Sequence, residues 1–397
     1  MTNPIHIYED GRPSLPSRVF LEFLTSTLSC NVGRNGYYMA TSWILVEAGF
    51  GSASVATLLL IVSASEFVTS PLAGMAADRF DRRRLTIAAD IGRFVVMLGT
   101  ACTIPYLNML VVIYLSANFF SFCDRMALTG SQALIPGLVH GRRLSKTNSA
   151  IFFTMQLGCL CAALLTGPLL RSHLPALVFI ILGGFFLISA GCLSSMRAAL
   201  HAHHIGKKCS SPRMAAHLFP LFAFYALLYG SAIVVSVMGA SFILEEQDGT
   251  ALDFGYLEAA WSVGSLIGAV LLIRLRKDTR THALHLMLLG LNGLALMALM
   301  LLRMPWILIN FAILGLLYNL GRVSVEVALQ LRLADHMLGR AKGIMHSFAA
   351  ALGLIIFGIV SFVGDTVRPS TIFFGFGVVL LVSLSVLSTM TQQKNGL

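Results

Sequence analysis

Twelve mostly apolar stretches of about twenty residues or more recur along this chain, and they constrain its fold more than any other feature. Each is long enough to cross a hydrocarbon layer of about 30 Å as a helix. Runs of this length without strict alternation are typical of membrane helices and not of barrel strands. The approximate cores are 18–46, 53–76, 85–104, 107–129, 146–170, 175–196, 217–242, 254–273, 283–302, 305–329, 343–363 and 370–390. We therefore predict an all-α membrane protein with twelve transmembrane helices.

The composition agrees with this prediction. Of the 397 residues, 56% are hydrophobic and only 12% are charged, whereas soluble domains carry about 25% charged residues. The net charge of +10 could suggest a nucleic-acid partner. However, the basic residues alternate with apolar spans and form no separate basic domain. We therefore expect the lipid bilayer, and no nucleic acid, as a partner.

The distribution of lysine and arginine predicts the orientation. If the N-terminus is cytoplasmic, 21 of the 28 basic residues fall in segments on the inner side, and the outer loops contain only Arg171, Arg303 and Arg368. Positive charge is retained on the cytoplasmic side of membrane proteins. Both termini are therefore expected in the cytoplasm.

The spans divide into two blocks of six. We expect a cytoplasmic tail at 1–17, a first bundle at 18–196, a basic cytoplasmic linker at 197–216, a second bundle at 217–390 and a second tail at 391–397. The linker contains several histidines but no acidic partners, and the cysteines form no CxxC pair, so we expect no metal site and no cofactor. Gly141-Arg142 and Gly339-Arg340, each expected in an inner loop before a helix, indicate that the halves are related.

A charged loop between the second and third spans gives the first indication of family. It contains Gly74, Asp78, Arg79 and Arg82, and Asp90 and Arg93 follow one turn apart in the third span. The spacing resembles the loop signature of the major facilitator superfamily. The resemblance implies two six-helix bundles around a central cavity, lined by helices one, four, seven and ten. It also implies that these six residues gate the cytoplasmic side.

Two further segments resemble the bacterial exporters of this superfamily, in the branch that includes the enterobactin exporter. They are Gln132-Ala133-Leu134-Ile135-Pro136, expected after the fourth helix, and Met337-Leu338-Gly339-Arg340, expected after the tenth. Gly167-Pro168 in the fifth span favours export over import, because such an element is found in many exporters and Pro168 allows a bend. The resemblance implies a transporter of the bacterial inner membrane, acting as a monomer.

Polar residues mark a candidate substrate cavity. In the first span they recur at steps of three and four residues and therefore share one helix face. Ionisable residues inside a span cost about 2.5–3.5 kcal/mol each on insertion scales, so each calls for a functional or structural reason. The predicted cavity residues are Asn31, Arg34, Asn35, Tyr38, Asn118, Ser121, Arg125, Tyr225, Tyr229, Asn319 and Arg322. Asp124, Glu326 and Glu66 are the candidates for proton coupling.

The charges of this set predict the substrate class. Three arginines against Asp124 and Glu326 give a positive bias, and guanidinium groups bind carboxylates in a bidentate manner. We therefore expect proton-coupled export of a small anionic or zwitterionic metabolite. Combined with the resemblance, this favours a carboxylate or hydroxamate siderophore of the aerobactin type.

Two other functions remain open. One is a multidrug or antibiotic efflux pump of the same fold. The other is a membrane receptor or assembly partner that transports nothing. An enzyme is not expected, because the chain has no Walker motif and no catalytic triad or carboxylate pair in a soluble context. The energy for transport would then come from protons or another ion.

Overall fold

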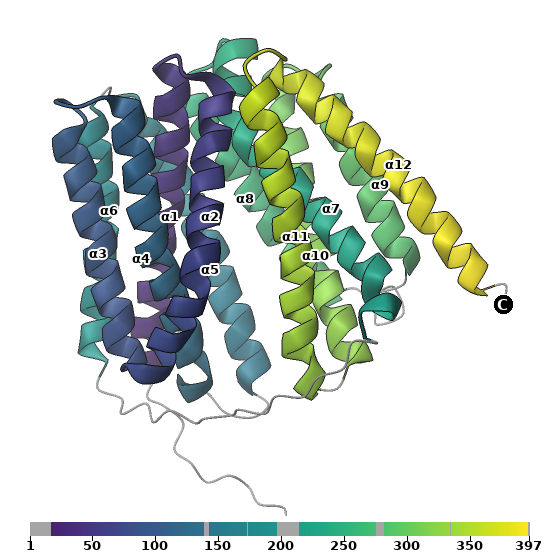
Figure 1. The fold of residues 1–397 in the computed structure, drawn as a ribbon, viewed down its shortest axis with the longest axis horizontal. Coiled ribbons are helices and arrows are strands. Elements are labelled where there is room, and N and C mark those ends of the chain that lie inside the picture. Colours follow the sequence, from purple (N-terminus) through teal and green to yellow (C-terminus); the bar gives the residue numbers. More distant parts are fainter. Residues whose placement is uncertain are drawn as a thin grey trace, which may run out of the picture.

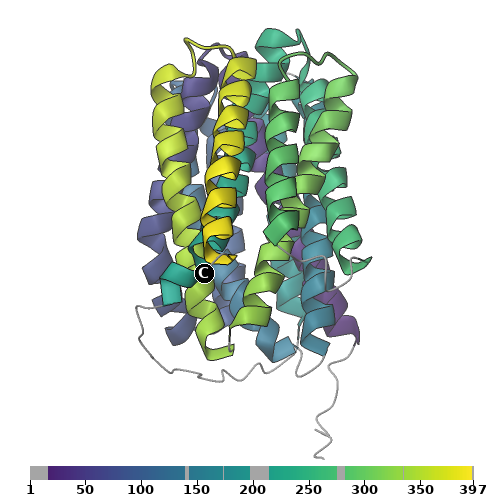
Figure 2. The ribbon, with the colours of Figure 1, turned by 90° about the vertical axis from the view of Figure 1, so that its right-hand side faces the viewer.

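The structure, a computed structural model, describes residues 17–138, 143–172, 174–196, 214–274, 282–333 and 335–395. These residues form twelve α-helices and one short π-helical segment, and they contain no strand. The helices run side by side, with the first six on one side of the molecule and the last six on the other (Figures 1 and 2). The helices are α1 (Ser17–Glu47), α2 (Gly51–Arg79), α3 (Arg82–Thr103), α4 (Met109–Leu138), α5 (Arg143–Leu170), α6 (Pro175–Ser195), α7 (Met214–Ser241), η1 (Phe242–Glu246), α8 (Ala251–Arg274), α9 (His282–Ala298), α10 (Trp306–Arg332), α11 (Asp335–Val363) and α12 (Pro369–Asn395).

Within the described residues, ten helices are long and apolar enough to cross a membrane. The apolar part of α9, Ala283–Ala298, is shorter than these ten. The helix α1 carries the predicted polar stripe, which lowers its mean hydropathy. The predicted all-α architecture is confirmed.

Several predicted boundaries differ from the structure. The segment 132–136 lies inside α4, and Gly339-Arg340 lies inside α11, although both were expected in loops. The helix α12 continues to Asn395, beyond the expected end of the second bundle at 390. The apolar pattern marks only the part of a helix in hydrocarbon, and these helices extend past it. Residues 1–16, Gly141-Arg142 and most of the linker at 197–216 lie outside the described residues.

The two halves repeat the same packing. The pairs α1–α5, α2–α4 and α3–α6 of the first half correspond to α7–α11, α8–α10 and α9–α12 of the second. Gly158 brings α5 against α1, where a Cβ would meet Asn31 Cβ at 2.7 Å. Gly353 brings α11 against α7, where a Cβ would meet Ile233 Cδ1 at 2.6 Å. The two glycines therefore allow the same close approach between corresponding helices of the two halves.

The halves meet where α1 joins α2, and this region is called the α1–α2 end. The carboxylate of Asp365, in the loop between α11 and α12, accepts a hydrogen bond from Ala53 N at 2.8 Å. Ser52 Oγ donates to the Gly364 carbonyl, also at 2.8 Å. Asp365 therefore caps the N-terminus of a helix in the other half, where negative charge is stabilised by the exposed N–H groups. Both loops lie at the top of Figure 1.

Gly51 makes this approach possible. Its φ of +68° lies in the left-handed region, and a Cβ at this position would fall 2.3 Å from Asp365 Oδ1. Any other residue would strain the backbone and would also collide with the capping carboxylate. The glycine is therefore required for both the turn and the contact.

Two more contacts close the same end. Gly167 of α5 packs on Gly255 of α8, with a Cβ on Gly167 only 3.1 Å from Gly255 Cα. Trp43 stacks on Phe254 at a centroid distance of 5.6 Å. The helix α5 continues past Pro168 to Leu170, so this element gives a close contact between helices near the end of α5.

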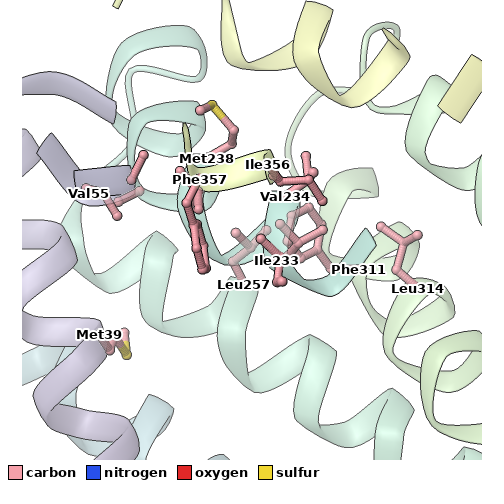
Figure 3. Packing of buried hydrophobic residues seen from close by; sticks show 14 of the residues in the cluster. Met39, Val55, Ile233, Val234, Met238, Leu257, Phe311, Leu314, Ile356 and Phe357 are labelled. Atoms are coloured by element: carbon pink, nitrogen blue, oxygen red, sulfur yellow. The ribbon is translucent and has the colours of Figure 1, made fainter. Parts of the chain in front are cut away.

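One apolar cluster, which includes Trp43 and Phe254, draws on residues of both halves. Figure 3 shows part of it, with Met39 and Val55 from the first half and others from the second. At the opposite end, called the α2–α3 end, a Cβ on Gly74 of α2 or on Gly343 of α11 would meet no atom within 4 Å. The helices α2 and α11 therefore touch at the α1–α2 end and leave these glycines free at the other.

The contact between Gly51 and Asp365 at the α1–α2 end can be tested by substitution. Gly51→Ala should break the contact with Asp365, so that the amides in the first turn of α2 exchange faster in hydrogen-exchange mass spectrometry. Gly49→Ala is the matched control, since Gly49 also has a positive φ, +84°, but open space around it. Equal exchange of this turn in the two variants would show that backbone strain, and not the contact, is responsible.

Candidate functional site

A cavity of about 430 Å³ lies between the two halves. The first half contributes side chains from α1, α2 and α5, and the second contributes side chains from α7, α8, α10 and α11. Its charged lining residues are Arg34, Glu66 and Glu258, and its large aromatic ones include Tyr38, Tyr229, Phe254, Trp261 and Tyr318. The cavity therefore combines a few charges with broad aromatic walls, a composition typical of sites for amphipathic small molecules.

Some predicted residues lie in this lining. They are Arg34, Asn35 and Tyr38 of α1, Tyr229 of α7 and the proton-coupling candidate Glu66 of α2. Ser42 and Ser236 lie there too. The Arg34 guanidinium is 5.8 Å from the centre of the Tyr38 ring, within the range of a cation–π contact. The polar face of α1 thus faces water-accessible space and not lipid.

The polar residues of α4 lie elsewhere, and none of the described α4 side chains lines the cavity. Ser121 is buried and donates to the Val62 carbonyl of α2 at 3.1 Å. Asn118 is exposed on a face away from the cavity lining. Arg125 has a buried Nε without a hydrogen-bond partner among the described residues. The expectation that helix four lines the cavity therefore differs from the structure, in which Ser121 binds α2 inside the first half and Asn118 and Arg125 lie outside the lining.

The predicted residues of α10 are also outside the lining. The Asn319 amide donates to the Ser265 carbonyl of α8. Glu326 lies between two cations, 3.5 Å from Arg322 and 3.7 Å from Lys342. Arg322 is also 5.7 Å from the ring of Phe152 in the first half. Arg322 and Glu326 are therefore already paired within the second half.

Tyr225 of α7 likewise lies outside the cavity lining. Its hydroxyl is 3.3 Å from Nδ1 of His346 in α11, and its ring stacks on Tyr229 at a centroid distance of 6.4 Å. Tyr225 therefore packs against Tyr229, which lines the cavity.

A buried ion network fills the interior of the first half. Asp124 is only 1% exposed. Its carboxylate accepts from Arg34 Nε at 2.8 Å and from Arg93 Nη1 at 2.7 Å. Arg93 also pairs with Asp90, and Asp90 accepts a hydrogen bond from Ser189 Oγ at 2.7 Å. The network joins α1, α3, α4 and α6 through charge-assisted hydrogen bonds.

A second cavity, of about 150 Å³, adjoins this network. Asn31, Asp90, Arg93 and Asp124 line it, and Arg34 lines both cavities. Asn31 is therefore separated from the central cavity, and its amide donates to the Thr27 carbonyl of its own helix at 2.8 Å. Arg34 lies at the boundary between the ion network and the central cavity.

The charged loop forms a two-residue turn between α2 and α3. Asp81 caps α3 by accepting from Arg84 N at 2.8 Å. Arg82 Nη1 donates to the Ala133 carbonyl of α4 at 2.9 Å, and Arg83 Nε donates to the Leu193 carbonyl of α6 at 2.6 Å. These arginines therefore link the start of α3 to α4 and α6 by hydrogen bonds.

The other residues of the predicted gate fall into two groups. Asp78 and Arg79 are exposed at the end of α2 and form no ion pair with another described residue. Asp90 and Arg93 belong to the buried network. The structure therefore does not bring the six gating candidates together as one cluster.

Sequence reasoning missed Glu258 of α8. It lines the central cavity with Phe254, Trp261 and Ser262, which lie one turn away on the same helix face. The residue follows closely on the acidic stretch 245–253 and has mainly aromatic neighbours on its face, so no polar stripe marked it. The rule that an ionisable residue inside a span needs an explanation would have found it.

This acid changes the charge balance that the sequence predicted. Arg125 and Arg322 do not line the cavity, and Arg34 is already paired with Asp124. Glu66 and Glu258 remain, and neither carboxylate forms an ion pair with any described residue. The lining therefore has a negative bias, in place of the positive one expected from the count of arginines.

The comparisons with known proteins give the family. The family model of the Major Facilitator Superfamily matches residues 23–358. The chain therefore belongs to the major facilitator superfamily and is a multi-pass membrane transporter.

Two curated relatives are exporters. The chain is 25% identical to the multidrug efflux pump Tap of Mycobacterium tuberculosis over 371 residues, which cover 84% of this chain and 85% of the relative. It is 26% identical to the enterobactin exporter EntS of Escherichia coli over 291 residues, which cover 70% of this chain and 69% of the relative. The chain is thus similar to both a drug exporter and a siderophore exporter.

Solved structures agree on the fold. A bacterial homologue of the iron transporter ferroportin, in an inward-facing state, has a TM-score of 0.73 at 19% identity and covers 95% of this chain and 100% of its own. The nucleoside transporter NupG has a TM-score of 0.71 at 14% identity, with coverages of 94% and 99%.

The ion network leads to a stability prediction. Asp124→Asn should lower the free energy of unfolding by about 3–5 kcal/mol, because it leaves buried Arg93 without one of its two carboxylate partners. Glu326→Gln is the control, because the pair of Glu326 with Arg322 is about one third exposed and such pairs contribute about 0–1 kcal/mol. Thermal unfolding of the two detergent-solubilised variants measures the difference, and similar midpoints would contradict the structural role of Asp124.

Proposed function

We propose that this protein is a secondary active exporter that uses a proton gradient to move a small amphipathic molecule. One observation carries the proposal: a cavity with two unpaired carboxylates and aromatic walls lies between two halves that touch at one end. Rocking of the halves would expose this cavity alternately to the two sides of the membrane. The absence of a Walker motif from the sequence favours an ion gradient as the energy source.

The placement of positive charge indicates how the protein is oriented in the membrane. The α2–α3 end contains Arg79 at the end of α2 and Arg82, Arg83 and Arg84 at the start of α3, and positive charge is retained in the cytoplasm. We infer that this end faces the cytoplasm of a bacterial inner membrane, with both termini inside, and that the chain acts as a monomer. The conformation described is then inward-facing. In the opposite state, the exposed Asp78 would gain a partner as the cytoplasmic ends approach, which is the gating role proposed for this loop.

The cavity favours multidrug efflux as the particular activity. An amphipathic molecule with a positive group would pair with Glu66 or Glu258 and would place its rings against Trp261 or Tyr318. The similarity to the efflux pump Tap supports this assignment.

Export of a siderophore of the carboxylate or hydroxamate type is the second candidate. The similarity to EntS supports it, and Arg34 could bind a carboxylate, since 29% of its side chain is exposed beside the cavity. Arg34 would then have to divide its hydrogen bonds between the substrate and Asp124.

Reconstituted vesicles test the proposal. With a proton gradient imposed across proteoliposomes, ethidium should be transported against its own gradient, and a protonophore should abolish this transport. Vesicles without protein give the background, and Glu245→Gln, which lies outside the cavity lining, should retain wild-type transport. An equal rate of ethidium transport with and without the protonophore would contradict proton coupling.

A deletion strain separates the two candidates. Drug efflux predicts greater sensitivity to several unrelated cationic drugs and unchanged siderophore secretion. Siderophore export predicts that, under iron limitation, one iron-chelating metabolite is lost from the medium and accumulates inside the cell. Normal drug sensitivity together with normal secretion would contradict both.

A further inference from the structure

Glu258 has an unusual environment for an acid inside a membrane helix. Its side chain lines the central cavity and is only partly exposed. Within the part of the chain that the structure describes, its carboxylate accepts no hydrogen bond and forms no ion pair. An ionised carboxylate in such a place is costly unless a partner accompanies it. Either a proton or a ligand cation has to supply that partner.

The other titratable groups that line the cavity do not provide a partner for Glu258. The other ones in the lining are Arg34, Tyr38, Glu66, Cys159, Tyr229 and Tyr318, from α1, α2, α5, α7 and α10. Among the residues that the structure describes, Arg34 is the only cation in this lining, and Asp124 binds it at 2.8 Å. No lysine, arginine or histidine in the lining is therefore free to neutralise Glu258.

The neighbours of Glu258 suit a positively charged organic group. Phe254 and Trp261 share its helix face, and the rings of Trp261 and Tyr318 have centroids 5.6 Å apart at a tilt of 36°. Aromatic faces attract cations, and the attraction is stronger away from water. A carboxylate among such rings recognises an amine or a quaternary cation better than an anion.

The backbone holds this acid in place beside the contact between the halves. A Cβ on Gly264 would fall 1.8 Å from the Ala312 carbonyl oxygen of α10, so α8 and α10 pack at backbone distance. One turn before Glu258, Gly255 packs on Gly167 of α5. A change of charge at Glu258 therefore occurs one turn from a contact that has to open when the halves rock.

We propose that Glu258 binds the positive group of the transported molecule and takes up a proton when that molecule leaves. This deepens the proposed export function and rests on it. The exchange is balanced: the carboxyl group loses its proton to water as the cation binds, and it regains one from water after the cation has dissociated. Glu66 lies in the same cavity, but the other lining residues of its helix are Leu59, Val62 and Ser63, none of which is aromatic, so we assign the exchange to Glu258.

Binding without a gradient tests the assignment. Tetraphenylphosphonium is a suitable probe because it is a permanent cation with no proton of its own. The purified full chain in weakly buffered detergent should release up to about one proton for each probe bound, measured with a pH indicator during titration. Glu258→Gln should remove this release and weaken binding about tenfold or more, because the charge attraction is lost.

Two further variants keep the result interpretable. Glu66→Gln should still release protons, and Tyr256→Phe, which changes an exposed residue of α8 outside the cavity lining, should resemble the wild type. If Glu258→Gln does not fold, Glu258→Asp should keep the proton release and change only the affinity. Proton release from Glu258→Gln equal to that of the wild type, loss of release in Glu66→Gln alone, or no probe binding by the wild type would overturn the assignment.

The same variants separate this inference from the proposed function. Gradient-driven ethidium transport by the wild type, together with equal transport by Glu258→Gln, would refute the role of Glu258 and leave the export function intact. Proton release on probe binding without any gradient-driven transport would refute the export function and support the site.

Discussion

The first half of this transporter depends on one carboxylate shared by two arginines. Asp124 binds Arg34 at 2.8 Å and Arg93 at 2.7 Å, and it is almost completely buried. Without Asp124, Arg34 would lose its carboxylate partner and Arg93 would keep only Asp90, although a charge in a membrane interior is costly unless it is paired. The network therefore fixes how α1, α3, α4 and α6 pack, and it also sets the charge that Arg34 presents to the central cavity. An arginine that is already neutralised attracts an anion less than an isolated one.

Backbone contacts through glycine determine how the halves and helices approach. Gly167 and Gly255 bring α5 against α8, and Gly264 brings α8 against α10. Without a hydrophobic driving force between helices in lipid, such close approaches allow van der Waals packing to stabilise the bundle. The cavity is the space that remains beyond these contacts, and the side chains that line it follow from where the contacts lie.

Much of the fold could be predicted from the sequence, because hydropathy and length determine membrane spans directly. The face of α1 that contains Arg34 and Tyr38 also followed from helical periodicity. The position of α4 did not, since Ser121 and Arg125 look the same in sequence whether they face a cavity or a neighbouring helix. Charge reasoning failed for a similar reason: a count of arginines ignores which of them are already paired. Glu258 was missed because its neighbours on the helix face are mainly aromatic, so no polar stripe marked it.

The cap on the N-terminus of α2 makes the contact between the halves sensitive to the salt concentration of the surrounding solution. The carboxylate of Asp365 belongs to one half and the helix N-terminus to the other, so this interaction exists only while the halves touch. Because it lies at a solvent-facing loop, dissolved ions screen it, and the Debye length falls from about 10 Å at 0.1 M salt to about 3 Å at 1 M. A higher ionic strength of the medium at that end therefore weakens this contact between the halves.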